Sequence, residues 1–406
     1  MTHASNASTL APRMQLIQPS PTSFIAQKAR ALRQAGRTII NLGVGELNFD
    51  TPPHIRQAAI HAIEKGETRY TDTSGTPALK AAIIAKFAQD NHLTYHPKEV
   101  LAATGAKQII FNAFLATLSA GDEVIIPAPY WVSYPDMVTL TGATPVIATP
   151  GPDDQLKLTP DVLRGLLSPF TRWLLINSPG NPSGALYSAE ELRALAKVLA
   201  DYPRVLVLSD DIYEDIVYEG QFSSFAQAAP TMLARTLTLN GVSKSFAMTG
   251  WRLGYAGGPE WLISAIDCLQ SHSTSNPSSI SQAAALAALS SARDYLPDWL
   301  NTLKQRRDCA LSILHQAAEQ LQPQPAPASF YLYVQCTKLL HKTTPQGVTL
   351  LNDTHVAQYL LEEAGVAVVP GHAFGLSPFF RLAYVASDAE VRDACTAIVA
   401  ACKKLQ

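Results

Sequence analysis

The sequence predicts an α/β protein in which helices cover both faces of a mostly parallel sheet, followed by a smaller α+β domain. Short apolar or β-branched runs alternate with helical patterns, which is typical of βαβ units. The runs lack polar alternation, as expected for strands that are covered on both faces. The chain of 406 residues is longer than one compact core usually holds. The predicted central strands are 124–126, 173–176, 205–208 and 236–239.

The N-terminal part is expected to contain a tail and three helices. Residues 1–11 are rich in Ser, Thr and Ala, which predicts a disordered tail. A signal peptide would need a basic start and then an apolar block, and this segment has neither. Apolar periodicity predicts a helix within 13–36 and helices over 53–66 and 78–90.

Helix start signals lie between the central strands. An apolar helix is predicted over 109–118, directly after a segment that contains Gly105. Thr159 precedes a proline that would occupy the first helical position. Ser188, with Glu191 three residues later, fits a capping box. Each signal indicates a helix that connects one strand to the next.

The C-terminal part is expected to form the second domain. A long helix from about 291 to 321 is predicted to join the two domains, and strands are predicted over 330–334, 366–369 and 380–385. Ser387 and Glu390 are predicted to cap a final helix. Its apolar face would hold Val391, Cys395, Ile398, Val399 and Cys402. The chain is therefore divided into a tail (1–11), a segment that packs with the small domain (12–48), a large domain (49–290) and a small domain (291–406).

Composition and charge exclude several classes of protein. A formal charge of −2 with 47% hydrophobic residues is typical of a soluble enzyme and not of a nucleic-acid binder, which needs a clustered basic face. No apolar run approaches the length of a membrane span. Five dispersed cysteines without a CxxC pair indicate reduced thiols in a cytoplasm. We expect a cytoplasmic protein without nucleic-acid or membrane partners.

The histidines do not indicate a metal centre. His92 and His96 have an HxxxH spacing, but Pro97 follows at once and no Glu or Cys completes a set of ligands. A zinc site needs at least three protein ligands, so no metal is predicted. His372 lies in a loop between glycines and is the histidine to examine, although a packed or solvated loop residue is the simpler interpretation.

Polar side chains follow directly after the predicted strands. Trp131, the segment 177–184, Asp210 with Tyr213, and then Lys244 all occupy such positions. Ligands of open α/β sheets bind outside the carboxyl ends of the strands. The sequence therefore predicts one crevice in which these residues meet.

Lys244 is the most reactive candidate in this crevice. It lies among Gly, Ser and Ala residues after the run 236–239. Loss of solvation lowers the pKa of an ammonium group, and the free amine is a nucleophile. This is the environment that a Schiff base requires.

The segment 239–255 resembles the lysine signature of class I aminotransferases, which are pyridoxal-phosphate enzymes of fold-type I. Among them the chain resembles the bacterial aspartate aminotransferases. The resemblance implies pyridoxal 5′-phosphate as cofactor, with Lys244 at the position that forms the aldimine. It places Arg252 and Ser243 at the cofactor phosphate.

Further cofactor contacts are implied by the same resemblance. Backbone amides at a helix start favour an anion, so Gly105, Ala106 and Lys107 are expected to hold the phosphate. Trp131 matches the aromatic residue that stacks on the pyridine ring, and Asp210 matches the carboxylate at the pyridine nitrogen. The residues matching those at the phenolic oxygen are Asn181 and Tyr213. A core tryptophan and a turn asparagine are the structural alternatives.

Several substrate contacts are also implied. Gly45 falls at the glycine whose amide approaches the substrate carboxylate, and Arg381 matches the arginine that clamps that carboxylate bidentately. Trp131 and Asn181 would contact the substrate as well. Tyr70 matches a tyrosine that reaches the phosphate of the neighbouring subunit, and Asn276 lies in a loop that crosses to the partner's site, which predicts a homodimer with shared active sites. A turn glycine, a structural ion pair and a buried loop tyrosine are the respective alternatives for Gly45, Arg381 and Tyr70.

The predicted activity is a ping-pong transamination between an L-amino acid and a 2-oxo acid. Lys107 either binds the distal carboxylate of a dicarboxylic substrate or is a solvated or phosphate-side lysine, and the first reading favours aspartate, glutamate and 2-oxoglutarate. An aromatic, prephenate or broad specificity is the alternative, because Tyr134, Phe374 and Trp131 could line a wider pocket. A β-lyase on the same scaffold and a non-catalytic cofactor-sensing domain are further alternatives.

Overall fold

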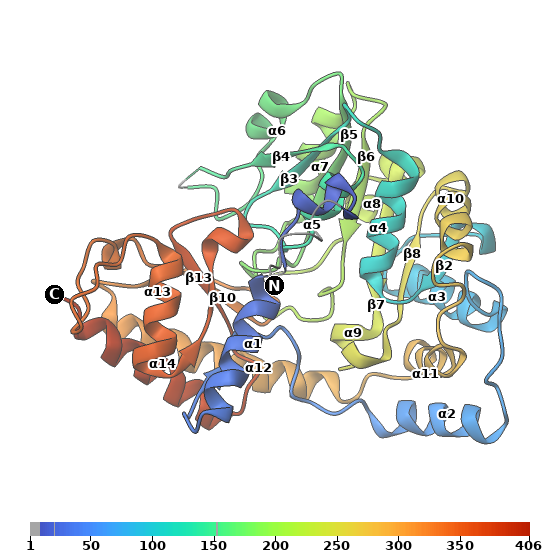
Figure 1. Ribbon diagram of the computed structural model, residues 1–406. Coiled ribbons are helices and arrows are strands. Elements are labelled where there is room, and N and C mark those ends of the chain that lie inside the picture. The colour runs from blue at the N-terminus through green and yellow to red at the C-terminus, as the bar shows by residue number, and fades with distance from the viewer. Residues whose placement is uncertain (1–8, 20, 152) are drawn as a thin grey trace.

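A computed structural model describes residues 9–19, 21–151 and 153–406. A seven-stranded sheet forms the centre of the larger part of this described chain (Figure 1). Strand β8 is antiparallel to both of its neighbours, and the other strands pair in parallel. In spatial order the strands are β2 (Val100–Ala103), β8 (Gly254–Gly257), β7 (Thr236–Gly241), β6 (Leu206–Asp210), β5 (Thr171–Asn177), β3 (Glu123–Pro127) and β4 (Thr144–Ala148).

Helices cover both faces of this sheet, as predicted. Trp173 and Leu175 of β5 belong to a core shared with one helix layer, whereas Leu174 and Ile176 belong to a core shared with the opposite layer. Because side chains alternate along a strand, each buried strand contributes to both cores. The first layer comprises α4 (Ala106–Thr117), α5 (Tyr134–Leu140) and α10 (Glu260–Ser271). The opposite layer comprises α6 (Pro160–Leu166), α7 (Ala189–Leu199) and α8 (Phe225–Ala228). On the same side, α3 (Pro77–Asn91) and α11 (Ser279–Ser290) lie near β2. Helix α2 (Pro53–Glu64) packs on α11.

A smaller α+β part contains a four-stranded antiparallel sheet within the described residues. The N-terminal segment joins this part, because β1 (Ile40–Asn41) pairs in parallel with β11 (Val366–Ala367). The four strands, in order, are β12 (Val369–Pro370), β13 (Phe379–Ala383), β10 (Tyr331–Gln335) and β9 (Gln322–Pro323). The helices are α12 (Leu296–Leu314), α13 (Asp353–Tyr359) and α14 (Asp388–Lys403).

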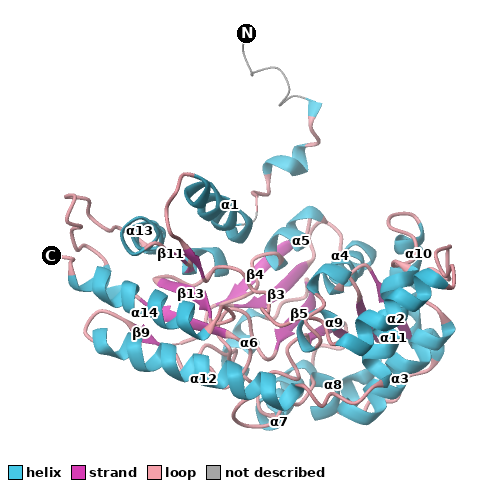
Figure 2. Ribbon diagram, turned by 90° about the horizontal axis from the view of Figure 1, so that it is seen from below, coloured by secondary structure: helices cyan, strands magenta, loops and turns pink. Residues whose placement is uncertain are grey.

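The arrangement confirms the predicted fold class. Figure 2 shows α1 (Pro21–Gln34) beside the smaller part, near β11. The proposed domain boundaries stay a prediction, and residues 1–8 of the predicted tail lie outside the described residues. Among the residues that the structure describes, no helix has the length and apolar character needed to cross a membrane.

Most helix starts follow the sequence signals. Ser188 and Ser387 each form the predicted capping box, and the five predicted apolar residues of α14 are buried. Thr159 is the N-cap of α6, but its side chain makes no cap hydrogen bond. The joining helix is shorter than predicted, because α12 begins at Leu296 and not at 291. Pro297 explains the late start, since proline is tolerated in the first turn of a helix and not further along it.

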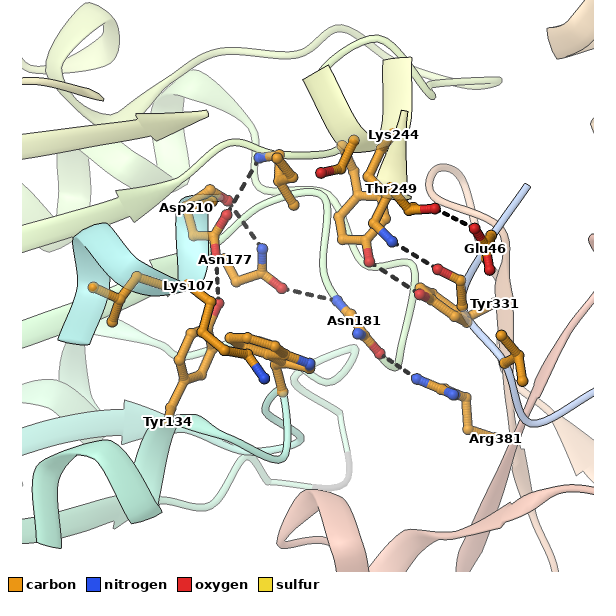
Figure 3. A pocket seen from close by; sticks show the side chains of 18 of the residues that line it. Glu46, Lys107, Tyr134, Asn177, Asn181, Asp210, Lys244, Thr249, Tyr331 and Arg381 are labelled. Atoms are coloured by element: carbon orange, nitrogen blue, oxygen red, sulfur yellow. Dashed lines mark hydrogen bonds between the residues drawn. The ribbon is translucent and has the colours of Figure 1, made fainter. Parts of the chain in front are cut away.

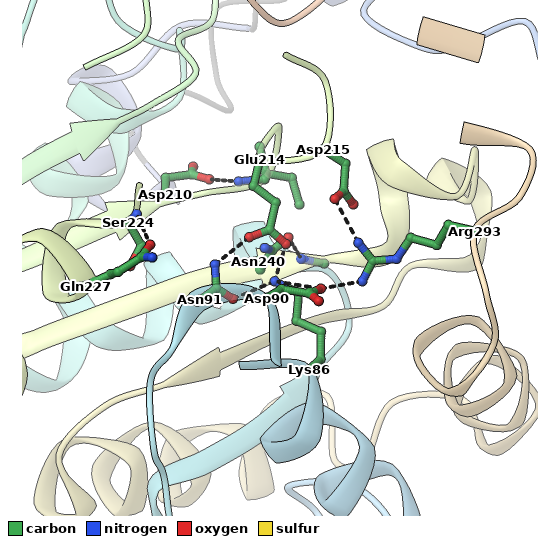
Figure 4. Close-up of polar contacts among 12 residues, drawn as sticks. Lys86, Asp90, Asn91, Asp210, Glu214, Asp215, Ser224, Gln227, Asn240 and Arg293 are labelled. Atoms are coloured by element: carbon green, nitrogen blue, oxygen red, sulfur yellow. Dashed lines mark hydrogen bonds and ion pairs between the residues drawn. The ribbon is translucent and has the colours of Figure 1, made fainter. Parts of the chain in front are cut away.

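A buried group of charged side chains connects α3 to the loop after β6. This group, the Lys86 cluster, consists of Lys86, Asp90, Asn91, Glu214, Asp215 and Arg293 (Figure 4). Lys86 and Glu214 are 4% and 7% exposed and contact each other directly. Asn91 accepts a hydrogen bond from Lys86 and donates one to Glu214, both at 2.7 Å. Every charge there has a partner of opposite sign, as burial of charge requires.

The Lys86 cluster lies close to the segment that carries Asp210 and Tyr213. Glu214 directly follows Tyr213 in the chain. Arg293 extends the network toward solvent by pairing with Asp90 at 2.6 Å and Asp215 at 2.8 Å. The cluster therefore ties the loop after β6 to α3 and to the connection between α11 and α12.

Candidate active site

A cavity of about 440 Å³ opens at the carboxyl ends of the central strands, between the two sheets. It brings together most of the residues predicted from sequence (Figure 3). Those that line it are Gly45, Ala106, Lys107, Trp131, Asn181, Asp210, Tyr213, Ser243, Lys244, Arg252 and Arg381. The crevice predicted from strand order is thus present in the structure.

Asp210 is the last residue of β6, where the register sets it opposite Asn177 of β5. Its carboxylate accepts a hydrogen bond from the Tyr134 hydroxyl at 2.6 Å and one from the Ile212 amide at 3.3 Å. Burial raises the pKa of Asp210 to about 6, although both hydrogen bonds favour the charged form and oppose the rise. A buried carboxylate of this kind would be stabilised by a cationic partner in the cavity.

Asn177 links two loops of the site. Its side chain donates to the Asp210 carbonyl and accepts from the Asn181 amide, each at 2.9 Å. The position of Asn181 is therefore tied to that of Asp210.

Lys244 lies in the short helix α9 (Val242–Ser245), directly after β7. Its amine donates a hydrogen bond of 2.6 Å to the carbonyl of Gly45. Burial lowers the pKa of Lys244 to about 8, against the opposing influence of the Glu46 carboxylate. A substantial fraction of the amine is consequently unprotonated in mildly alkaline solution, as the sequence predicted for a nucleophilic lysine.

The start of α4 lies beside Arg252 at the cavity. Gly105 is the N-cap of α4 and has no side chain. The first backbone amides of α4 therefore receive no side-chain capping hydrogen bond. Absence of a side chain permits two close approaches. A Cβ at Gly105 would lie 2.4 Å from Arg252 Nη2, and one at Gly254 would lie 2.2 Å from the Ala106 amide nitrogen. Free amides, the helix dipole and a guanidinium group together favour a phosphate.

Arg381 lies on β13 and is 2% exposed. It donates from Nη1 to Asn181 Oδ1 at 2.9 Å and from Nη2 to the Gly43 carbonyl at 2.5 Å. Its Nε is buried and has no hydrogen-bond partner among the described residues. No carboxylate of the described chain forms an ion pair with it, so the structural alternative of an internal ion pair receives no support.

Lys107 lies in the first turn of α4 and is exposed at the rim of the cavity. Its amine lies 4.6 Å from the centroid of the Trp131 ring and donates to Ser133 Oγ at 3.3 Å. A positive charge therefore faces the cavity beside an aromatic surface.

A few predicted residues lie elsewhere. Tyr70 is 90% exposed, and the Asn276 side chain donates to the Pro277 carbonyl at 2.8 Å; among the described residues neither lines this cavity. Both were predicted in connection with a partner subunit. Gly105 lies behind Arg252. His372 is exposed and does not line the cavity within the described chain.

The suggestion that Phe374 lines a wider pocket is wrong. Its ring packs against Arg381, 4.9 Å from Cζ, and so lies behind the guanidinium group. Tyr134 does line the cavity, but its hydroxyl is committed to Asp210.

The sequence patterns missed several residues of the site. Tyr331, Glu46 and Thr249 line the cavity, and Glu46 accepts a hydrogen bond from Thr249. Asn177 also lines the cavity; it belongs to the segment 177–184 that was predicted to enter the crevice, but it was given no role of its own. Tyr331 could not have been predicted, because a strand pattern does not indicate which of its aromatic residues lines a cavity.

The raised pKa of Asp210 predicts a pH dependence of stability. A carboxyl group whose pKa rises from 3.8 to about 6 on folding stabilises the protein fully below pH 3.8, and this contribution is lost as the pH rises through 6. Between pH 4.5 and 7.5 the loss corresponds to about 2 kcal/mol. The Asp210→Asn variant should lack this component. Its free energy of unfolding, relative to that of wild type, should therefore rise by about 2 kcal/mol between pH 4.5 and pH 7.5. Urea unfolding of the cofactor-free proteins measures the difference. The exposed Asp161→Asn variant is the control, and a parallel pH profile for wild type and Asp210→Asn would contradict the prediction.

The chain is similar to several known proteins. The family model described as aminotransferase class I and II matches residues 37–398. The chain is 49% identical to an aspartate aminotransferase of Rhizobium meliloti, over 97% of this chain and 96% of that one. It is 48% identical to a probable aspartate/prephenate aminotransferase of Rickettsia bellii, over 98% and 100% of the two chains. The crystal structure of an aspartate aminotransferase from Rhizobium meliloti superposes with a TM-score of 0.94 at 48% identity, covering 98% of this chain and 99% of that one.

Proposed function

The chain belongs to the class I and II aminotransferases, and from this premise we propose that it uses pyridoxal 5′-phosphate to move an amino group between a dicarboxylic L-amino acid and a 2-oxo acid. That it is an aminotransferase follows from the family. The cofactor and the substrates are the proposal. One observation carries it: a lysine with a lowered pKa, a buried carboxylate and an arginine with an unpaired Nε line one cavity beside an anion-binding helix start.

The groups that line the cavity fit this cofactor. Its phosphate would be held by the free amides at the start of α4, by Arg252 and by Ser243. Asp210 would pair with the protonated pyridine nitrogen, which relieves the cost of burying the carboxylate. Lys244 would form the covalent bond to the aldehyde, Trp131 would cover the ring, and Tyr213 and Asn181 would donate to the phenolic oxygen.

Pyridoxal phosphate supplies an electron sink that accepts the electron pair left when a substrate loses its Cα proton. Lys244 would act as the general base for this proton, and general-base catalysis of this kind typically accelerates a reaction by ~10²–10⁴-fold. Its lowered pKa provides the free amine. Asp210 would keep the ring cationic, and Arg381 would hold the α-carboxylate through the N–H groups of its terminal nitrogens that Asn181 and the Gly43 carbonyl leave free.

Aspartate and glutamate, with oxaloacetate and 2-oxoglutarate, are the proposed substrates. Arg381 and Lys107 contribute two positive charges to the same cavity, which suits two carboxylates. The named relatives include aspartate and aspartate/prephenate aminotransferases. Prephenate is the second candidate, because it also carries two carboxylates and because Trp131 offers an aromatic surface.

The proposed working unit is a cytoplasmic homodimer. An exposed tyrosine at position 70 is consistent with a residue that contacts a second subunit. Sedimentation of the purified protein, compared with that of Tyr70→Ala, tests this part of the proposal.

The activity test mixes the pure, cofactor-loaded protein with aspartate and 2-oxoglutarate. Formation of oxaloacetate and glutamate in equal amounts is the expected result. Pyruvate from a sulfur amino acid, without transfer of the amino group, would support a β-lyase instead, and absence of any turnover would support a sensing role. A panel of amino donors and 2-oxo acid acceptors, with prephenate among the acceptors, then ranks the substrates.

A Lys107→Met variant tests the distal contact. We expect the KM for aspartate and 2-oxoglutarate to rise about 10- to 100-fold, because a hydrogen bond to a charged group is removed. The KM for alanine or phenylalanine should change little, since these substrates lack a distal carboxylate. Steady-state kinetics with dicarboxylic and with monocarboxylic substrates measure how far the two KM changes differ. Lys98→Met, which removes an exposed lysine, is the control, and an equal effect on all substrates would assign Lys107 to the phosphate side.

A further inference from the structure

Tyr331 occupies a central position in the cavity. It is the first residue of β10 and is 1% exposed. Its hydroxyl lies 3.0 Å from the Tyr213 hydroxyl, and its ring centroid lies 4.5 Å from Arg381 Cζ. Figure 3 shows Tyr331 on the side of the cavity that faces Lys244 and Glu46. One side chain thus contacts both the proposed phenolic-oxygen tyrosine and the proposed carboxylate clamp.

We propose that Tyr331 is a positioning residue for the transamination, acting through Tyr213 and through Arg381; this inference rests on the proposed function. Its hydroxyl sets the direction in which Tyr213 donates its proton. Its ring holds the guanidinium group of Arg381 in the orientation that receives a carboxylate.

The hydroxyl part follows from counting protons. A tyrosine hydroxyl has one proton to donate and two lone pairs to accept. If Tyr213 donates to the cofactor's phenolic oxygen, the proton between the two tyrosines belongs to Tyr331. Tyr213 then accepts from one side and donates to the other, and hydrogen bonds in such a chain strengthen one another in a dry site. The two rings pack edge to face at 82°, and their hydroxyl oxygens lie 3.0 Å apart.

The ring part follows from the surroundings of Arg381. The rings of Tyr331 and Phe374 lie 4.5 and 4.9 Å from its Cζ. Asn181 and the Gly43 carbonyl take one proton from each terminal nitrogen. These contacts fix the guanidinium group and leave the second N–H of each terminal nitrogen for a ligand.

Gly45 holds Tyr331 in this place. A Cβ at Gly45 would lie 2.1 Å from the Tyr331 hydroxyl oxygen, so any side chain there would displace the hydroxyl. The structure therefore gives Gly45 a packing reason beyond the amide contact predicted from sequence. The same glycine accepts the hydrogen bond from Lys244.

A Tyr331→Phe variant tests the hydroxyl. It keeps the ring and removes only the proposed donor to Tyr213. With a weaker hydrogen bond to the phenolic oxygen, the pH midpoint of the visible absorbance of the cofactor-loaded protein should rise by about 0.5–1 unit. The dissociation constant for succinate, a dicarboxylate that cannot react, should stay close to that of wild type.

A Tyr331→Leu variant tests the ring. Loss of the cation–π contact should weaken succinate binding by about 5- to 30-fold, measured by calorimetry. Tyr384→Phe is the matched control, because it removes a buried tyrosine hydroxyl that is bonded to the Ser329 carbonyl outside the cavity. If the leucine variant does not fold, the phenylalanine variant still decides the hydroxyl part of the proposal.

The outcomes are distinct. A wild-type protein that neither binds the cofactor nor transaminates overturns the proposed function. If the wild type is active but the pH midpoint of absorbance of Tyr331→Phe lies within about 0.2 unit of the wild-type midpoint, this inference is overturned. Loss of one hydrogen bond should shift the midpoint by more than that. A shift equal to that of Tyr384→Phe also overturns the inference, whereas a shift confined to position 331 supports it.

Discussion

Replacement of Lys244 by alanine is expected to abolish transamination, with kcat falling by at least ~10⁴-fold, the upper end of what a general base contributes. The variant would lose both proposed roles of the amine, the covalent bond to the cofactor and the transfer of the Cα proton. Lys244 has a lowered pKa because it is buried, and its neighbour in the cavity is the Gly45 carbonyl. Coupled assay of oxaloacetate formation measures the loss.

Lys197→Ala, which removes an exposed lysine of α7, is the control for this experiment. It should leave kcat unchanged. Mass spectrometry after borohydride reduction should find the cofactor attached to the peptide that contains residue 244. Near-normal turnover by Lys244→Ala, or a label on another lysine, would refute the assignment.

Replacement of Lys86 by methionine is expected to destabilise the protein by about 3–5 kcal/mol, because it leaves a buried carboxylate without its cation. Glu214 is 7% exposed, and its remaining partner is the neutral amide of Asn91. The free energy of unfolding, measured in urea near pH 7.5, gives the size of the effect.

A double-mutant cycle separates the charge from the packing. Glu214→Gln combined with Lys86→Met removes both charges and should recover part of the loss, because no unpaired charge stays buried. Lys98→Met breaks only an exposed ion pair with Glu260 and should cost less than about 1 kcal/mol. A double variant as unstable as the sum of the single ones would show that Lys86 and Glu214 do not interact.

Strand periodicity revealed β3, β5, β6 and β7 of the large sheet but not β8, which lies between β2 and β7. The runs that became β3, β5, β6 and β7 are continuous and apolar because both faces are covered. Strand β8 has the sequence Gly-Tyr-Ala-Gly and gives no such signal. Its glycines serve close packing, since a Cβ at Gly254 or Gly257 would collide with Ala106 or Tyr95. Such contacts join distant segments and leave no local pattern.

The site was predictable where chemistry and sheet topology coincide. Asp210 ends β6 and Lys244 follows shortly after β7, so their meeting could be inferred from strand order. Tyr331 and Glu46 come from the smaller part and the N-terminal segment, whose placement over the sheet depends on packing. Tyr70 and Asn276 concern a second subunit, and their roles stay predictions.

The side-chain direction of Asp210 is dictated by the pleat of β6, since successive residues of a strand point to opposite faces. Deleting one residue anywhere along Leu206–Ser209 would therefore rotate the carboxylate out of the cavity without altering a single functional group. The number of residues in this strand therefore decides whether the Asp210 carboxylate faces the cavity. Changes of length are better tolerated in surface connections such as 340–350, where no ligand depends on the parity of the chain.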